Sequence, residues 1–192
     1  MARNTNFNKD EVLEKTMHLF WAKGFDGTSL DDILKETGLL KGSLYHTFKS
    51  KENLFKLCLE KYGIRSKSFF YRDEDDPIDY IRNFFKRLVS EGVKEDAKGC
   101  LIMNSCLEFS NVSNELSKEN EKLFNAVETN MLRVANKLLK DEKIKTSKSA
   151  KQLGRQFVVA AFSIREFSKF RKDKLFLKEI ANNALFAVNI KI

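Results

Sequence analysis

The sequence predicts an all-α protein of about nine helices. Its 192 residues contain a single proline, Pro77, so little interrupts a helix. Leucine, lysine and glutamate, which favour helices, are abundant. Apolar residues recur at helical spacing from the first segment onward. At 42% hydrophobic residues, the chain has enough apolar side chains for a packed core, and we expect an N-terminal helical module packed on a larger C-terminal one.

Four helices are expected before the proline, and each has a recognisable boundary. Asn8, Ser29 and Ser50 are good N-caps because their short side chains accept hydrogen bonds from the first free backbone N–H groups. Gly24 and Gly38 follow helical segments and are typical of helix ends. The expected helices cover about 9–23, 30–37, 41–47 and 51–71.

Five further helices are expected in the C-terminal part. Asp76 followed by Pro77 is a strong helix start, and the DEDDP stretch that ends there is the best candidate boundary between the two modules. The later breaks are Gly92, the cluster 111–114, the charged stretch 141–148 and KFRKDK. The expected helices cover about 77–92, 98–110, 114–140, 147–169 and 173–190.

The net charge of +8 is compatible with a polyanionic partner, but its location matters more than its size. Residues 1–50 carry seven basic and seven acidic side chains, whereas Lys137–Lys178 carries thirteen basic and four acidic ones. The overall excess therefore does not mark the N-terminal module. Within that module, however, the segment Thr37–Lys51 holds three lysines and no acid.

That acid-free segment contains the second half of a helix-turn-helix pattern, two short helices joined by a turn that begins with glycine. On a helical wheel, Leu44 and Phe48 share one face and must be buried. Short and hydrogen-bonding residues occupy the rest of the helix, namely Gly42, Ser43 and His46 opposite, with Tyr45 and Thr47 on the flanks. Such a face suits contact with DNA bases or phosphates, and carboxylates would repel DNA. A solvated turn in another all-α fold is the alternative interpretation.

Lysines mark the amino ends of two helices, Lys41 on the third and Lys51 on the fourth. Free backbone N–H groups and the helix dipole favour a phosphate at both places. The run GFDGTSLDDILKETGLLKGSLYHTFKSKENLF resembles the N-terminal DNA-binding domain of the TetR/AcrR family of bacterial transcriptional regulators, over roughly residues 8–60.

The resemblance implies operator contacts from Thr28, Lys41, Tyr45, His46, Thr47 and Lys51, with Gly42 and Ser43 on the reading face. The family often has serine or threonine where this chain has Leu40, which cannot donate to a phosphate and instead packs inward or touches a thymine methyl group. The expected division is a DNA-binding domain at 1–50 and a ligand-binding and dimerisation domain at 51–192, linked by the helix at about 51–71.

The segment GCLIMNSCLEFS, the long helix after it and LGRQFVVAAFSIREF look like one common C-terminal subtype of the family. This resemblance implies a ligand pocket and a dimer formed by the last two helices. The dimer candidates are apolar residues of those helices, Ala160, Ile164, Ile180, Ala184 and Val188. The pocket candidates are Tyr62, Phe85, Leu88, Met103, Phe109, Phe124, Val127, Met131 and Phe157. For both sets, ordinary core packing is the alternative interpretation.

Three cysteines, an odd number, argue against a disulfide framework and favour a reducing compartment. Cys100 and Cys106 lie about 240° apart on a helix, so they are small buried hydrophobes or separate oxidant-sensing thiols. The N-terminus lacks a signal-peptide core and no apolar run spans a bilayer, so we expect a cytoplasmic protein without a membrane partner.

No catalytic constellation, metal site or cofactor site is expected, because GLLKGS lacks the P-loop spacing and only His18 and His46 are available as histidines. The sequence thus predicts a non-enzymatic regulator, a dimeric repressor that binds a palindromic double-stranded operator and is released by an unknown small, mainly apolar inducer. The alternatives are a thiol-based sensor of oxidants or electrophiles, a ligand-independent architectural DNA-binding protein, and a peripheral membrane or protein-interaction module.

Overall fold

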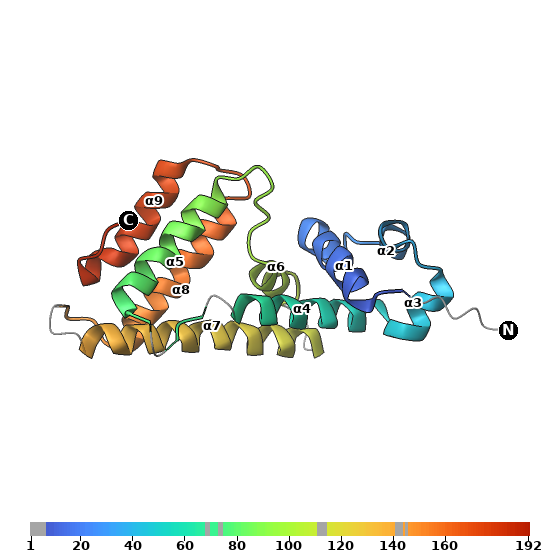
Figure 1. Ribbon diagram of the computed structural model, residues 1–192, viewed down its shortest axis with the longest axis horizontal. Helices are drawn as coiled ribbons and strands as arrows, with labels where there is room; N and C mark the ends of the chain where they lie inside the picture. The colour runs from blue at the N-terminus through green and yellow to red at the C-terminus, as the bar shows by residue number, and fades with distance from the viewer. Residues whose placement is uncertain (1–6, 68–69, 73–74, 111–114, 141–143, 145) are drawn as a thin grey trace. The chain divides into compact units, whose positions relative to one another are not determined.

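The computed structural model describes residues 7–67, 70–72, 75–110, 115–140, 144 and 146–192, and over these residues the protein is all-α (Figure 1). No strand occurs in the described part of the chain. The helices are α1 (Lys9–Lys23), α2 (Leu30–Thr37), α3 (Lys41–Phe48), α4 (Lys51–Lys67), α5 (Pro77–Gly92), α6 (Leu101–Glu108), α7 (Glu115–Lys140), α8 (Ala150–Phe167), α9 (Lys174–Leu185) and the 3₁₀ turn η1 (Phe186–Val188). The predicted all-α class and its number of helices are confirmed for the described residues.

The predicted helix boundaries hold best where a capping side chain is present. The Asn8 carboxamide oxygen accepts hydrogen bonds from two N–H groups of α1, and Ser29 forms a capping box with Asp32 at the start of α2. Asp76 caps α5, which runs from Pro77 to Gly92 as predicted.

Other ends differ from the prediction. Helix α6 covers only Leu101–Glu108 of the expected 98–110, and α9 gives way to a 3₁₀ turn after Leu185. Tight last turns of this kind are common at helix ends. The predicted breaks at 111–114 and at 141–143 and 145 lie outside the described residues, as do residues 73–74 of DEDDP. The fourth helix was expected to run to about residue 71, but α4 ends at Lys67 and residues 70–71 are not helical, while residues 68–69 lie outside the described part of the chain.

The chain divides into two compact units. Unit 1 comprises Met1–Lys67 and Asn104–Glu121, and unit 2 comprises Ser68–Met103 and Lys122–Ile192. The compact units differ from the functional division expected at residue 50, because α4 packs on α1 and α3 and because residues 104–121 return to the N-terminal helices. The functional division itself stays a prediction.

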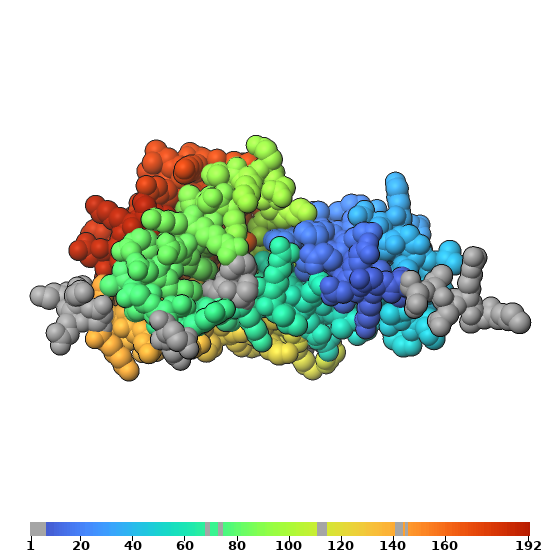
Figure 2. Space-filling view, viewed as in Figure 1, coloured from blue at the N-terminus to red at the C-terminus, as the bar shows by residue number. Residues whose placement is uncertain are grey.

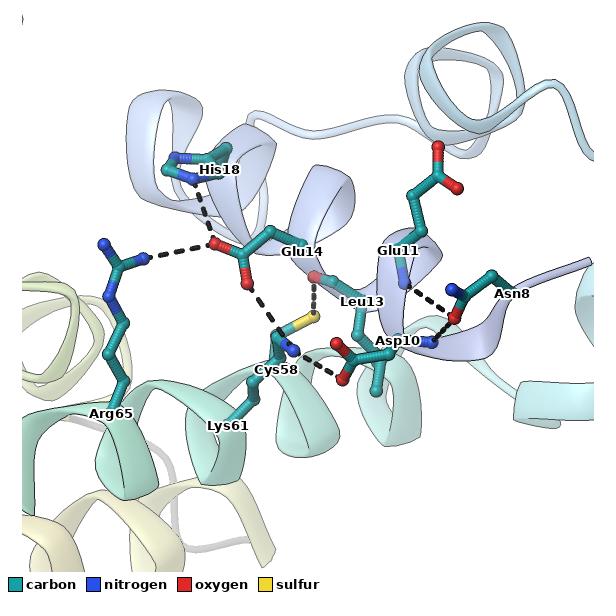
Figure 3. A network of polar contacts seen from close by, with 9 residues as sticks. All are labelled: Asn8, Asp10, Glu11, Leu13, Glu14, His18, Cys58, Lys61 and Arg65. Atoms are coloured by element: carbon teal, nitrogen blue, oxygen red, sulfur yellow. Dashed lines mark hydrogen bonds and ion pairs between the residues drawn. The ribbon is translucent and has the colours of Figure 1, made fainter.

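Unit 1 is held together by the packing of α1 on α4 and by ionic contacts beside it (Figure 3). Lys61 of α4 pairs with Asp10 and, at 3.5 Å, with Glu14 of α1. Arg65 Nη1 lies 3.1 Å from a Glu14 oxygen. These contacts fix the position of α1 along α4, so the helices that carry the candidate site have a firm support.

In unit 2, α8 and α9 pack on each other and both contact α5. Atoms of α5 and α9 lie side by side on the face shown in Figure 2, in green and red. The Phe85 and Phe157 rings are both fully buried, with centroids 6.0 Å apart. A Cβ on Gly154 of α8 would lie 3.1 Å from the Leu132 backbone of α7, so these two helices approach closely.

Candidate nucleic-acid interface

Helix α3 has one buried face and one open face. Leu44 and Phe48 are 2% and 1% exposed, as the helical wheel predicts. Among the residues predicted to contact DNA, the exposed ones on this helix are Lys41, Gly42, Tyr45 and His46, and the half-buried ones are Ser43 and Thr47. The buried pair therefore fixes the rotation of α3, and the polar residues are left on the surface.

Two turns position α3. Gly38, at φ 70°, ends α2 in the left-handed conformation that glycine adopts without strain. Leu40 then occupies the N-cap position of α3, where its side chain offers no hydrogen bond, and it is 73% exposed. Inward packing of Leu40 is thus wrong, and contact with a thymine methyl group stays a prediction.

The turn after α3 is tight and leads directly into α4. Lys49 has φ 69° and ψ −54°, close to the strained γ-turn conformation, and the Ser50 N–H donates to the Phe48 carbonyl oxygen at 2.8 Å. Ser50 Oγ accepts from the Asn53 N–H at 3.1 Å, which confirms its predicted capping role. The arrangement brings the start of α4 directly after α3 along the chain.

Lys51 opens α4 and is half-buried. Its Nζ atom lies 4.2 Å from the centroid of the Phe25 ring, within the range of a cation–π interaction. The ammonium group is therefore held at the amino end of α4, where a phosphate is also favoured by the helix dipole.

Thr28 does not belong to the open face. Its side chain is fully buried, and its hydroxyl donates a 2.6 Å hydrogen bond to the Gly24 carbonyl oxygen. The predicted DNA contact of the Thr28 side chain is corrected on this ground, because the hydroxyl closes the turn between α1 and α2 instead.

Gly42 lies in open space, as Gly38 does, but it lacks the positive φ that favours glycine at Gly38. A Cβ at Gly42 would meet no atom of this chain within 4 Å, whereas a Cβ at Gly27 would lie 2.3 Å from the Lys23 carbonyl oxygen. The fold therefore requires glycine at position 27 and not at position 42. Glycine at position 42 is instead consistent with the close approach of an external surface.

Two acidic groups of unit 1, Asp32 and Asp10, lie in the first turns of α2 and α1 and bind lysines. Lys23 and the N–H and hydroxyl of Ser29 bind the Asp32 carboxylate and hold its pKa well below the ordinary value. Lys61 donates a hydrogen bond to the Asp10 carboxylate, and this bond raises the pKa of Lys61. Both carboxylates neutralise nearby cations and lie outside the segment Thr37–Lys51.

The predicted pocket residues fall into two groups. Tyr62 and Phe109 belong to unit 1, where the Tyr62 ring packs edge-on against Trp21 and the Phe109 ring lies 5.3 Å from Phe25. The candidates of unit 2 are Phe85, Leu88, Met131 and Phe157, which are buried, and Met103, Phe124 and Val127, which are half-buried. The nine residues therefore do not all belong to one compact unit, and a pocket lined by them stays a prediction.

The predicted dimer contacts need correction. Ala160, Ile164, Ala184 and Val188 are 6%, 0%, 3% and 1% exposed, because their own chain covers them; only Ile180 is half-buried. Small residues on α8 and α9 serve the close packing of helices within unit 2. The exposed apolar side chains on these elements are different ones, Val159, Leu175 and Phe186 at 65%, 68% and 82%, and Phe167 at 38%.

The three cysteines differ in their surroundings. Cys58 is fully buried, its thiol donates to the Leu13 carbonyl oxygen at 3.6 Å, and burial raises its pKa. A protonated, buried thiol is unreactive. Cys100 is buried just before α6, and Cys106 is half-buried within it. The described residues hold no group of three or more His, Cys, Asp or Glu side chains arranged to bind a metal ion, and none of the described helices is long and apolar enough to cross a bilayer.

Two residues around Lys51 were missed by sequence reasoning. Phe25 supplies the ring beneath the Lys51 ammonium, and Glu108 binds the backbone of Phe25 from 83 positions along the chain. The one available signal was chemical, because Glu108 is the sole charged residue of α6, LIMNSCLE.

Comparison with known proteins supports the interpretation of this region. Residues 12–58 match the model of the bacterial regulatory proteins of the tetR family. The HTH-type transcriptional repressor ComR of Escherichia coli is 28% identical over 116 residues, which are 58% of this chain and 55% of ComR. The chain thus spans a little over half the length of such curated relatives.

Solved structures share the fold over nearly the whole chain. A TetR transcriptional regulator from Chloroflexus aurantiacus has a TM-score of 0.81 at 19% identity, with 95% of this chain and 94% of that one covered. A cysteine mutant of the TetR-family regulator CifR, in complex with a 26-base-pair operator duplex, has a TM-score of 0.77 at 20% identity, with 97% and 100% covered.

The structure thus defines an all-α fold that carries a helix-turn-helix near its N-terminus. Residues 12–58 match the tetR family of bacterial regulatory proteins by sequence, and the chain shares its fold with solved TetR-family structures over nearly its whole length.

Proposed function

We propose that this protein is a cytoplasmic transcriptional regulator that binds duplex DNA with the open face of α3 and the start of α4. One observation carries the proposal: Leu44 and Phe48 are buried, while the rest of α3 presents short polar side chains in a segment, Thr37–Lys51, that contains no acid. Lys41 and Lys51 supply a cation at each helix start, where phosphates bind. The operator complex of CifR supports the same use of the fold.

The role of the protein is that of a dimeric repressor. DNA readers of this type place two helices in successive major grooves about one helical turn apart, which takes two copies. Val159, Leu175 and Phe186 are exposed apolar side chains on α8, α9 and η1, and they are the contacts that a second copy would cover. ComR is named as a repressor, which supports the sign of the control.

Release from DNA is by a small, mainly apolar ligand that binds unit 2. The half-buried Phe124 ring stacks on Phe162 at 5.5 Å, and Met103 and Val127 are also half-buried, so apolar groups are available there without full burial. Such a ligand must favour the geometry that does not bind DNA, with a coupling of about 1–3 kcal/mol for a substantial loss of occupancy. A dye and metabolite screen by thermal shift tests this, and an absence of any stabilising compound would favour the architectural alternative.

Thiol sensing is the second candidate, and it depends on Cys106. This residue is half-buried on α6, whereas burial makes Cys58 unreactive. The protein with all three cysteines changed to alanine would keep its DNA binding under peroxide if thiols are the sensor. Equal loss of DNA by this variant and the wild type under oxidant would eliminate the thiol candidate.

The test of the main proposal is selection of genomic DNA fragments by the purified protein. Enrichment of fragments with a roughly palindromic site is expected, and the neighbouring genes would indicate the ligand class. Binding without enrichment of any sequence would eliminate a sequence-specific regulator, and preferential binding to anionic vesicles would favour a peripheral membrane protein.

A further inference from the structure

Glu108, the last residue of α6, binds the turn that follows α1. Its two carboxylate oxygens accept hydrogen bonds from successive backbone N–H groups, Oε2 from Phe25 at 2.9 Å and Oε1 from Asp26 at 2.8 Å. Bonds from N–H groups to a carboxylate are among the stronger hydrogen bonds in proteins. Because both donors are backbone atoms, Glu108 fixes the turn itself and not merely one side chain.

The side chain of Phe25 is held from the same segment of the chain. Its ring centroid lies 5.3 Å from that of Phe109, the residue after Glu108, and 5.2 Å from that of Phe55 on α4. Phe25 is only 9% exposed. Glu108 therefore holds the backbone of Phe25, and Phe109 packs against its ring. Phe25, Phe55, Glu108 and Phe109 all lie in unit 1.

The Phe25 ring in turn carries the Lys51 ammonium, 4.2 Å from its centroid. Lysine has a flexible stem of four carbons, and ordering it before a partner arrives reduces the entropy lost on binding. A ring that is itself fixed can hold the ammonium at the amino end of α4, whereas a loose ring cannot.

We propose that Glu108, together with Phe109, is a positioning residue for DNA binding: it fixes Phe25, and Phe25 holds the Lys51 ammonium ready for a backbone phosphate. The inference rests on the proposed function, since Lys51 must contact DNA. Under this proposal α6 helps to order the DNA-contacting surface directly, and it does so whether or not a ligand is bound.

A double-mutant cycle tests the proposal. The probe is a duplex of about 30 base pairs, long enough for two half-sites one helical turn apart, recovered from a random pool by the wild-type protein. Glu108→Gln keeps the side-chain length but removes one acceptor and the charge. We expect it to weaken binding about 3- to 10-fold in the wild-type background and to have little further effect in the Lys51→Ala background.

The matched control is Glu121→Gln, which makes the same charge change at an exposed position of unit 1 and is expected to leave affinity unreduced. A second measurement needs no DNA: the ε-methylene protons of Lys51 should show an upfield ring-current shift that Glu108→Gln diminishes. Thermal unfolding of each variant separates positioning from loss of the fold. If Glu108→Gln does not fold, Phe25→Leu replaces it in the cycle, since leucine keeps apolar volume without an aromatic face.

Equal weakening by Glu108→Gln in both Lys51 backgrounds would overturn the inference, as would no weakening at all or the same loss from Glu121→Gln. In these cases the wild type still binds its duplex, so the proposed function stands. Failure of the wild-type protein to recover any duplex would defeat the proposed function and this inference together.

Discussion

Helix α3 and the pair α8–α9 carry similar sequence patterns, with small and apolar residues at helical spacing, but the patterns have different meanings. In α3 the apolar residues Leu44 and Phe48 are buried and the small residue Gly42 is open to solvent. In α8 and α9 the small residues Ala160 and Ala184 are buried in their own chain. Periodicity therefore identifies which face of a helix is covered, but not whether the same chain or another molecule covers it.

The largest expected effects come from two neighbours on α8 that separate these two kinds of burial. Ala160→Arg should destabilise the monomer by about 3–5 kcal/mol, because it places an uncompensated charge in the core. Val159→Arg should leave the thermal unfolding temperature nearly unchanged, since Val159 is 65% exposed, but lower operator affinity about 100-fold by preventing dimerisation. Calorimetry and analytical ultracentrifugation measure the two effects.

Asn125→Arg on α7 is the control for Val159→Arg, since it adds the same charge at an exposed position of unit 2. A dimer that survives Val159→Arg would show that the exposed apolar residues of α8 and α9 are not its interface. The contrast between residues buried by their own chain and residues covered by a second copy would then fail for α8 and α9.

Within the open face of α3, Ser43→Ala tests whether polar side chains read bases. A lost contact to a base edge should cost about 1–3 kcal/mol at the preferred sequence and relax selectivity at one position of each half-site. Repeating the selection from random DNA with the variant measures this change. An unaltered preferred sequence would remove Ser43 from the reading face.

Lys51→Ala should act on every sequence alike. Loss of one phosphate contact lowers the magnitude of the slope of log affinity against log salt by about 0.9 for each binding site, with no change in preference. Titrations over a range of salt concentrations supply the slope. A slope equal to that of the wild type would place Lys51 outside the phosphate contacts.

Gly42→Ala separates what the fold requires from what a partner requires. Alanine is the better helix former and its Cβ would meet nothing in this chain, so the free energy of unfolding should rise by about 0.5–1 kcal/mol. DNA binding should weaken nonetheless if the groove approaches the backbone of α3 at this position. Greater stability with unimpaired DNA binding would show that Gly42 faces only solvent.

The sequence was informative at most places where the cause of a structure is local. The caps at Asn8, Ser29 and Asp76 and the buried pair of α3 depend on residues within a turn or two of each other, and all were predicted. Thr28 was assigned to the DNA contacts from resemblance alone, and the bond from its hydroxyl to the Gly24 carbonyl oxygen, only four positions away, was not foreseen.

Contacts between distant segments were the part that could not be predicted. The bonds from Phe25 and Asp26 to Glu108 span 83 and 82 positions, and no periodic pattern encodes such a pairing. The same limit explains the misassigned dimer residues, because α5, which covers part of α8 and α9, lies far from them in the sequence.

The smallest expected effect concerns the stability of α2, which precedes α3, and not the residues of α3 that contact DNA. Asp32 lies in the capping box of α2, and its hydrogen bonds lower its pKa in the folded state. A lowered pKa contributes stability that is complete above the unfolded value, about 3.9, and that is lost as pH falls through the folded value. The free energy of unfolding of the wild type should therefore decline below about pH 4 more steeply than that of Asp32→Asn, and the difference between them should be constant at neutral pH. Asp31→Asn, which removes the same charge from an exposed position in the same turn, is the control. Urea titrations at several pH values measure the difference. If the free energies of unfolding of the wild type and Asp32→Asn change in parallel down to pH 3, the Asp32 carboxylate stabilises neither α2 nor α3, the helix that follows it.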